Sequence, residues 1–219
     1  LGLILNELRK SKKLKNLGVD TNRPGRGAIK GKKETAVWDC LRFKEAGKTD
    51  NFTKHPHLTV VIHPERLQVL ATLPNAAEGA IRKRIFGQGY EYFHRLVFQV
   101  AQSMKKVIKL DPAAKPYIQV LQRHYRSLNS PGIEDAVLKY DIRTILNKGG
   151  NKEKFQPQWI HATYDVMIKK KSNLQFEFGV DFPFSTSRTA NNSKTINAIE
   201  ESFFAMKSFI LIAFHKERR

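Results

Sequence analysis

The sequence predicts an α+β fold, in which an antiparallel sheet built from two β-hairpins plus flanking strands carries long helices packed on one face. Two stretches of the chain carry apolar residues at every second position, which is the period of a strand, and then turn back on themselves. Two longer stretches repeat apolar residues at helical spacing. The chain has 219 residues, of which 41% are hydrophobic, so it is long enough to bury a core around such a sheet.

We expect two parts along the chain. Residues 1–34 read as a basic N-terminal helix, ended by Gly18 in the manner of a C-terminal cap, followed by a flexible arm in which Gly and Pro separate cations. Residues 35–219 read as a single α+β domain. Its elements follow one another as strand, hairpin and helix twice, which suggests two halves, 35–112 and 113–219.

The first of these halves begins with an alternating strand over residues 35–43. A hairpin follows, with strands over residues 58–62 and 67–73 and a turn at residues 63–66. Because nearly both faces of this hairpin are apolar, we expect it to lie centrally in the sheet.

A helical pattern then runs from residue 75 to residue 110. Asn75 is placed to cap its start, with Glu78 as the matching acid of a capping box. The Gly87-Gln88-Gly89 break is expected to divide the pattern into a short and a long helix.

The second half contains two segments whose apolar residues fit more than one period. Residues 116–126 and 135–146 fit a strand or a helix, and the alternation in the second segment favours a strand. A second hairpin is predicted from residues 160–168 and 174–182, with every apolar residue on one face. A last helix is expected over residues 193–216.

The charge of the chain indicates a polyanionic partner. There are 39 Lys and Arg residues against 20 Asp and Glu residues, a formal net charge of +19. The first 33 residues alone carry ten of the cations and two of the acids. Nucleic acid, DNA or RNA, is the first candidate and an anionic membrane surface the second, while a solubilising role for the charge is the simpler alternative. The longest apolar run, residues 209–214, is too short to span a bilayer.

The predicted phosphate contacts are cations of the N-terminal segment and of four further clusters. Lysines suit point-charge contacts and arginines suit forked contacts with phosphate, and Tyr125 stands among cations where it can stack on a base. Lysines at a hairpin tip also protect a sheet edge from pairing with another strand, and this is the alternative interpretation of the cluster at residues 169–171. The predicted contacts are Lys10, Lys12, Lys13, Lys15, Arg23, Arg26, Lys30, Lys32, Lys33, Arg82, Lys83, Arg84, Arg123, Arg126, Lys169, Lys170 and Lys171, and Lys105, Lys106 and Lys109 form a supporting cluster.

A metal-dependent nuclease is the alternative function. If the second hairpin forms, Asp165 and Glu177 lie on adjacent strands and face the same side, with Asp181 nearby. Such carboxylates can hold a divalent cation, Mg²⁺ in this reading, and Lys169 can steady a charged transition state. The Lys spacing differs from that of restriction-type nucleases, and a solvated sheet face with cross-strand charge pairs explains the same residues.

Other chemistries find less support. His55, His57 and His63 can be read as a metal site or as exposed loop histidines, and Cys40 as a buried inert thiol. A single Cys excludes a disulfide framework and is compatible with an intracellular location, cytoplasmic or nucleoid or nuclear. The chain also lacks a Walker A motif, which disfavours an ATPase or GTPase.

The sequence therefore favours a nucleic-acid-binding protein without catalytic activity and without a cofactor, acting as a subunit of a larger nucleoprotein complex. A scaffold protein whose basic segment docks on an acidic protein partner is a further alternative. Both readings depend on cations that gather on the folded surface.

Overall fold

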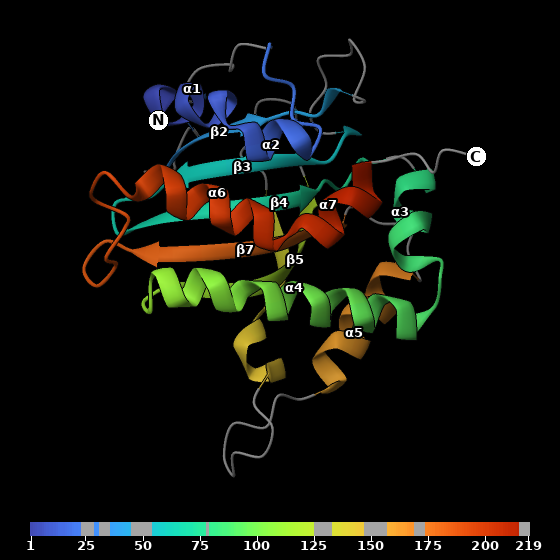
Figure 1. Ribbon diagram of the computed structural model, residues 1–219. Helices are drawn as coiled ribbons and strands as arrows, with labels where there is room; N and C mark the ends of the chain where they lie inside the picture. Colours follow the sequence, from blue (N-terminus) through green and yellow to red (C-terminus); the bar gives the residue numbers. More distant parts are fainter. Residues whose placement is uncertain are drawn as a thin grey trace.

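The computed structural model confirms the α+β class (Figure 1). It describes residues 1–22, 29–30, 36–44, 54–77, 79–124, 133–146, 157–168 and 174–214. Over these residues seven strands form one sheet in the order β1-β2-β3-β4-β7-β5-β6. Every neighbouring pair is antiparallel.

The strands are β1 (Ile29–Lys30), β2 (Val37–Leu41), β3 (His57–Ile62), β4 (Arg66–Leu73), β5 (Lys115–His124), β6 (Ile133–Asp141) and β7 (Leu174–Pro183). The helices are α1 (Gly2–Lys10), α2 (Lys12–Asn16), α3 (Gly79–Phe86), α4 (Tyr90–Leu110), α5 (Pro157–Ile168), α6 (Thr195–Ala205) and α7 (Lys207–Phe214), with a 3-10 helix, η3 (Ile142–Leu146). Helices α6 and α7 cross the front of the sheet in Figure 1, with α1 and α2 above them and α4 below.

The first hairpin is confirmed. Strands β3 and β4 pair in the register Val60↔Val69, and β4 is fourth of the seven strands, so the hairpin lies in the sheet interior as its two apolar faces predict. The flanking strand predicted over 35–43 is β2, and the segment 135–146 is mainly β6, as its alternation indicates.

The second hairpin is wrong in its first strand, because residues 157–168 form helix α5. Ile160, Tyr164 and Met167 stand at i, i+4 and i+7, and this helical spacing turns all three towards the core. The segment 160–168 also carries apolar residues at every second position, as a strand does, although a strand would place Met167 on the face opposite Ile160 and Tyr164. The apolar alternation alone therefore does not choose between strand and helix. The return strand exists as β7, but it pairs with β4 and β5.

The predicted helices form, each interrupted once. The N-terminal helix breaks at Ser11, the 75–110 pattern breaks between Phe86 and Tyr90, and the last helix breaks at Met206. Asn75 does not cap α3, which begins at Gly79, and Glu78 lies outside the described residues.

Gly18 ends α2 as predicted. Its φ of 88° is in the left-handed region, where a residue without Cβ is unstrained. The Val19 amide donates to the Leu14 carbonyl at 3.1 Å, and the Gly18 amide to the Lys15 carbonyl at 3.0 Å. This is a Schellman motif, and its hydrophobic pair, Leu14 and Val19, is buried.

The core lies between the sheet and its helices. Alternate residues of β7 from Leu174 to Phe182 enter it, and aromatic rings of α4 and α7 pack on them. Phe176 contacts Phe93 edge-on at 5.9 Å between ring centroids, and Phe209 at 5.5 Å. Leucines of α1 and α2 belong to this same core, so the N-terminal helices are packed against the domain.

The opposite face of β7 carries a close contact between Gly179 and Tyr117 of β5. The two residues are register partners, and the Tyr117 ring crosses over the glycine. A Cβ at position 179 would lie 2.3 Å from the ring, which only a displaced Tyr117 could accept. Because Tyr117 is buried and hydrogen-bonded to Gln68, it cannot move freely.

Gly179→Ala is therefore expected to lower the free energy of unfolding by about 1–3 kcal/mol, as overpacking does in well-filled sites. Urea unfolding measures the change. The matched control is Gly79→Ala in α3, where an added Cβ meets nothing within 4 Å and the substitution should be neutral or stabilising. Equal stability of the two variants would contradict the close contact.

Candidate nucleic-acid interface

The predicted phosphate contacts fall into three groups. Those outside the described residues are Arg23, Arg26, Lys32, Lys33, Arg126, Lys169, Lys170 and Lys171. Lys30 and Arg123 lie in β1 and β5, where the structure describes the strand and not the side chains. The remaining predicted cations all belong to helices α1, α2 and α3.

The lysines of α1 and α2 are exposed. Lys12 and Lys15 stand on the surface of α2, and Lys10 pairs with Glu7 one turn earlier at 2.7 Å. Lys13 instead donates to Glu201 of α6 and so joins the N-terminal helices to the last helical layer. That hydrogen bond and the charge of Glu201 raise the pKa of Lys13. The lysines without this role are available to an anion.

Two of the predicted arginines stabilise the fold by donating to backbone carbonyls. Arg82 donates to the Leu174 carbonyl at 3.0 Å, and burial lowers its pKa. Arg84 donates to the Ile212 and Ala213 carbonyls at 3.1 and 2.9 Å, in the last turn of α7. Carbonyls at a helix end lack intrahelical donors, so Arg84 caps α7 and interacts favourably with the helix dipole. We therefore leave Arg82 and Arg84 out of the interface; Lys83 between them is exposed.

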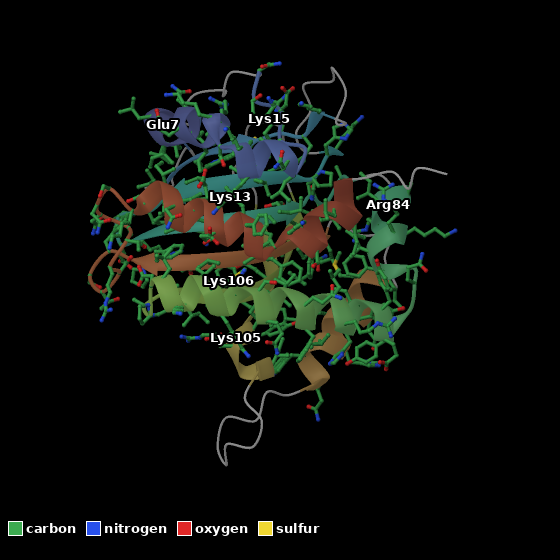
Figure 2. All side chains as sticks on the ribbon, viewed as in Figure 1. Glu7, Lys13, Lys15, Arg84, Lys105 and Lys106 are labelled. Carbon is green, nitrogen blue, oxygen red and sulfur yellow. The ribbon has the colours of Figure 1, made fainter. Side chains whose placement is uncertain are left out.

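Helix α4 displays a basic face towards solvent. Arg95, Lys105, Lys106 and Lys109 are exposed, and at 3.6 residues per turn they share an arc of about 100° opposite the buried stripe. We call these four residues the α4 basic face. Figure 2 shows Lys105 and Lys106 on α4, on the same side of the sheet as Lys13 and Lys15 of α2. Arg95 was not among the predicted contacts, although a helical wheel of residues 90–110 places it with the three lysines.

Asp111, the residue that follows α4, holds the loop that contains Arg188. Its side chain is fully buried and accepts from Thr189 Oγ1 at 2.7 Å, Ser187 Oγ at 2.5 Å and the Ala113 amide at 3.0 Å. Arg188, which is exposed, stands between Ser187 and Thr189. The hydrogen bonds of its two neighbours therefore hold Arg188 at the C-terminal end of α4.

The predicted carboxylate set does not assemble. Asp165 lies on α5, where it pairs with His161 one turn earlier at 3.2 Å. Glu177 and Asp181 do share the face of β7 turned away from the helices, with exposed fractions of 3% and 8%. Asp165 and the other two acids thus come from separate elements, and the expected cross-strand pair of Asp165 and Glu177 is wrong.

Glu177 and Asp181 belong to a buried polar network. Glu177 accepts from Thr72, Gln119 and Gln175 at 3.3, 3.2 and 2.5 Å. These donors are neutral amides and a hydroxyl. They give the buried carboxylate oxygens of Glu177 the hydrogen bonds that buried polar groups need.

Asp181 is the charged centre of this network. It accepts from Lys139 at 3.0 Å and from Gln68 at 3.0 Å, and Arg66 Nε lies 3.7 Å away. Gln68 also donates to the Tyr117 hydroxyl at 2.6 Å, and Lys139 Nζ stands 3.7 Å from the centroid of the Tyr117 ring. Burial, together with the charges of Asp181 and Glu177, raises the pKa of Tyr117 well above its ordinary value. Sequence reasoning missed this network because its members come from four strands that only the sheet order brings together.

The histidines and Cys40 do not gather into a site. The His57 ring contacts the His55 carbonyl at 2.9 Å, and the His63 ring contacts Gln68 at 3.3 Å. Cys40 is buried, as predicted. Over the described part of the chain, no group of three or more His, Cys, Asp or Glu side chains is placed to hold a metal ion.

Comparisons with protein families, with curated proteins and with solved structures found no match for this chain. Among the described helices, none has both the length and the apolar composition needed to cross a membrane.

Arg84→Ala is expected to lower the free energy of unfolding by about 1–2 kcal/mol, because two carbonyls of α7 lose a charged donor. Thermal or urea unfolding measures the loss. Lys83→Ala removes one cation from the neighbouring position and should leave stability unchanged, since Lys83 is exposed. A Lys83→Ala variant as unstable as Arg84→Ala would argue against the capping role.

Asp111→Asn is expected to destabilise the protein by about 2 kcal/mol at pH 7. Burial alone would raise the pKa of Asp111, but hydrogen bonds from Ser187, Thr189 and the Ala113 amide outweigh it and lower the pKa below 3.8. The ionised carboxylate thus contributes stability above the unfolded-state pKa, and this contribution is lost as the pH falls through the folded-state pKa. Urea unfolding at pH 7 and near pH 3 should show the difference between wild type and variant shrinking at the lower pH. A difference that is constant with pH would contradict the assignment.

Proposed function

We propose that this protein binds nucleic acid through its helical layer, with the α4 basic face as the main contact and Lys10, Lys12 and Lys15 as a second contact. The observation that carries the proposal is the gathering of four exposed cations on one face of α4. A regular helix holds these charges at set positions along a line, which suits the repeating charge of a phosphate backbone. The net charge of +19 adds long-range attraction to any polyanion.

The contacts of the acids favour binding over cleavage. Asp181 is paired with Lys139, and Glu177 is surrounded by donors from Thr72 and Gln119. These contacts account for the burial of both carboxylates by a structural role within the sheet. Asp165 stands on another element, so the chemistry of a two-carboxylate metal site has less support than a binding role.

Binding should weaken steeply as salt rises, because each phosphate neutralised by a cation releases counterions. The measurement is the fluorescence anisotropy of a labelled oligonucleotide titrated with the protein at several salt concentrations. Replacing Lys105, Lys106 and Lys109 together by Ala should reduce the slope of log K against log salt by about 2 on single strands, since each contact contributes roughly 0.7.

The charge-matched comparison is Lys106→Ala against Lys115→Ala. Lys115 is exposed and shares its side of β5 with Tyr117, away from the helices, whereas Ile118 enters the helix-side core. Lys106→Ala should weaken binding and Lys115→Ala should not. Affinity that stays constant from low to moderate salt, or equal losses for the two variants, would overturn the proposal.

A further inference from the structure

Three rings stand at helical spacing on one edge of α4. Tyr90, His94 and Phe98 occupy positions i, i+4 and i+8, so they follow one another along the helix surface. Tyr90 and His94 are partly exposed, with their ring centroids 5.8 Å apart, and 40% of Phe98 is exposed. His161 of α5, which is also exposed, adds a ring 4.7 Å from Tyr90.

These rings adjoin the α4 basic face. Phe98 lies one turn after Arg95 and two turns before Lys105, within the same outward arc. Isolated exposed apolar residues are common on protein surfaces and need no explanation. Here the exposed ring continues a line of partly exposed rings and stands between cations, which is the combination that single-stranded nucleic acid requires.

The spacing of the rings suits separated bases. Four residues of α-helix rise about 6 Å, so successive rings lie farther apart along α4 than the 3.4 Å between neighbouring bases of a duplex strand. An extended single strand can turn its bases towards such a row, because its bases are free to leave their own stack. In a duplex each base face is covered by the neighbouring base, so only the cations of α4 can contact the nucleic acid, through its phosphates.

We propose that single-stranded nucleic acid lies along α4. Its bases stack on Phe98 and on the partly exposed rings of Tyr90 and His94, and its phosphates are held by Lys105, Lys106 and Lys109. This inference rests on the proposed nucleic-acid-binding function and adds its substrate class. The rings select the single strand, and the cations supply most of the affinity.

The test compares a labelled oligothymidine and oligouridine with a duplex of the same length, at one salt concentration and across a salt series. The wild-type protein should bind the single strands more tightly than the duplex. Phe98→Ala should weaken single-strand binding about 5-fold or more, since stacking on one base is worth at least about that factor. It should leave duplex binding and the salt slope unchanged, whereas Lys106→Ala should reduce the slope on both.

Two variants serve as controls. Phe98→Tyr keeps a ring and should retain the single-strand affinity, and Leu3→Ala removes a residue that is 83% exposed on α1 and should change nothing. Phe98→Ala should stay folded and unfold cooperatively well above the assay temperature, because Phe98 lies on the outward arc of α4 and 40% of it is exposed.

The outcomes separate the two proposals. Duplex binding as tight as single-strand binding, or unchanged single-strand affinity of Phe98→Ala, would overturn the single-strand assignment and leave the binding function standing. No salt-dependent binding to either form would overturn both. Tighter binding of either single strand than of the duplex, lost in Phe98→Ala, would support the assignment, and comparing the two shows whether oligothymidine or oligouridine is the better ligand.

Discussion

The packing of β7 against helices α4 and α7 is the contact on which the architecture depends. β7 pairs with β4 on one side and β5 on the other, so it joins β1–β4 to β5–β6 in a single sheet. Its helix-side residues, Phe176 and Phe178 among them, are fully buried and meet rings from both helices. Burial of large rings contributes several kcal/mol of hydrophobic stabilisation, and their edge-on geometry adds to it.

The other face of the same strand is held by polar contacts. Tyr117 crosses Gly179, and Asp181 accepts from Gln68 and Lys139. A buried acid costs free energy unless donors surround it, so these partners are required for β7 to lie in the middle of the sheet. One strand thus uses its apolar face to hold the helices and its polar face to set its position among the strands. The helices, held in this way, carry exposed cations on their outer side.

Local patterns predict the parts of this fold whose stabilising contacts are local. The left-handed Gly18 and the break before Gly89, whose φ is 93°, are visible because glycine marks such backbone directly. Residues 160–168 fit both periods, and tertiary packing of Ile160 and Met167 decides for the helix. The lysines of α4 are recognisable as a cluster in the sequence. In contrast, the caps made by Arg84 and the network of Asp181 need partners that lie far away along the chain, and no spacing rule finds them.

The bond between Lys13 and Glu201 has a consequence for how the chain folds. It links two helices separated by most of the polypeptide, and Leu5 and Leu8 of α1 fill a core that α6 completes. Because α1 and α2 are synthesised before α6, the part of their apolar side that α6 covers stays open until α6 has been synthesised. Such distant pairings close large loops, which slows folding relative to a chain with neighbouring contacts. Part of the apolar surface of the nascent chain therefore stays in contact with water until residues 195–205 have left the ribosome.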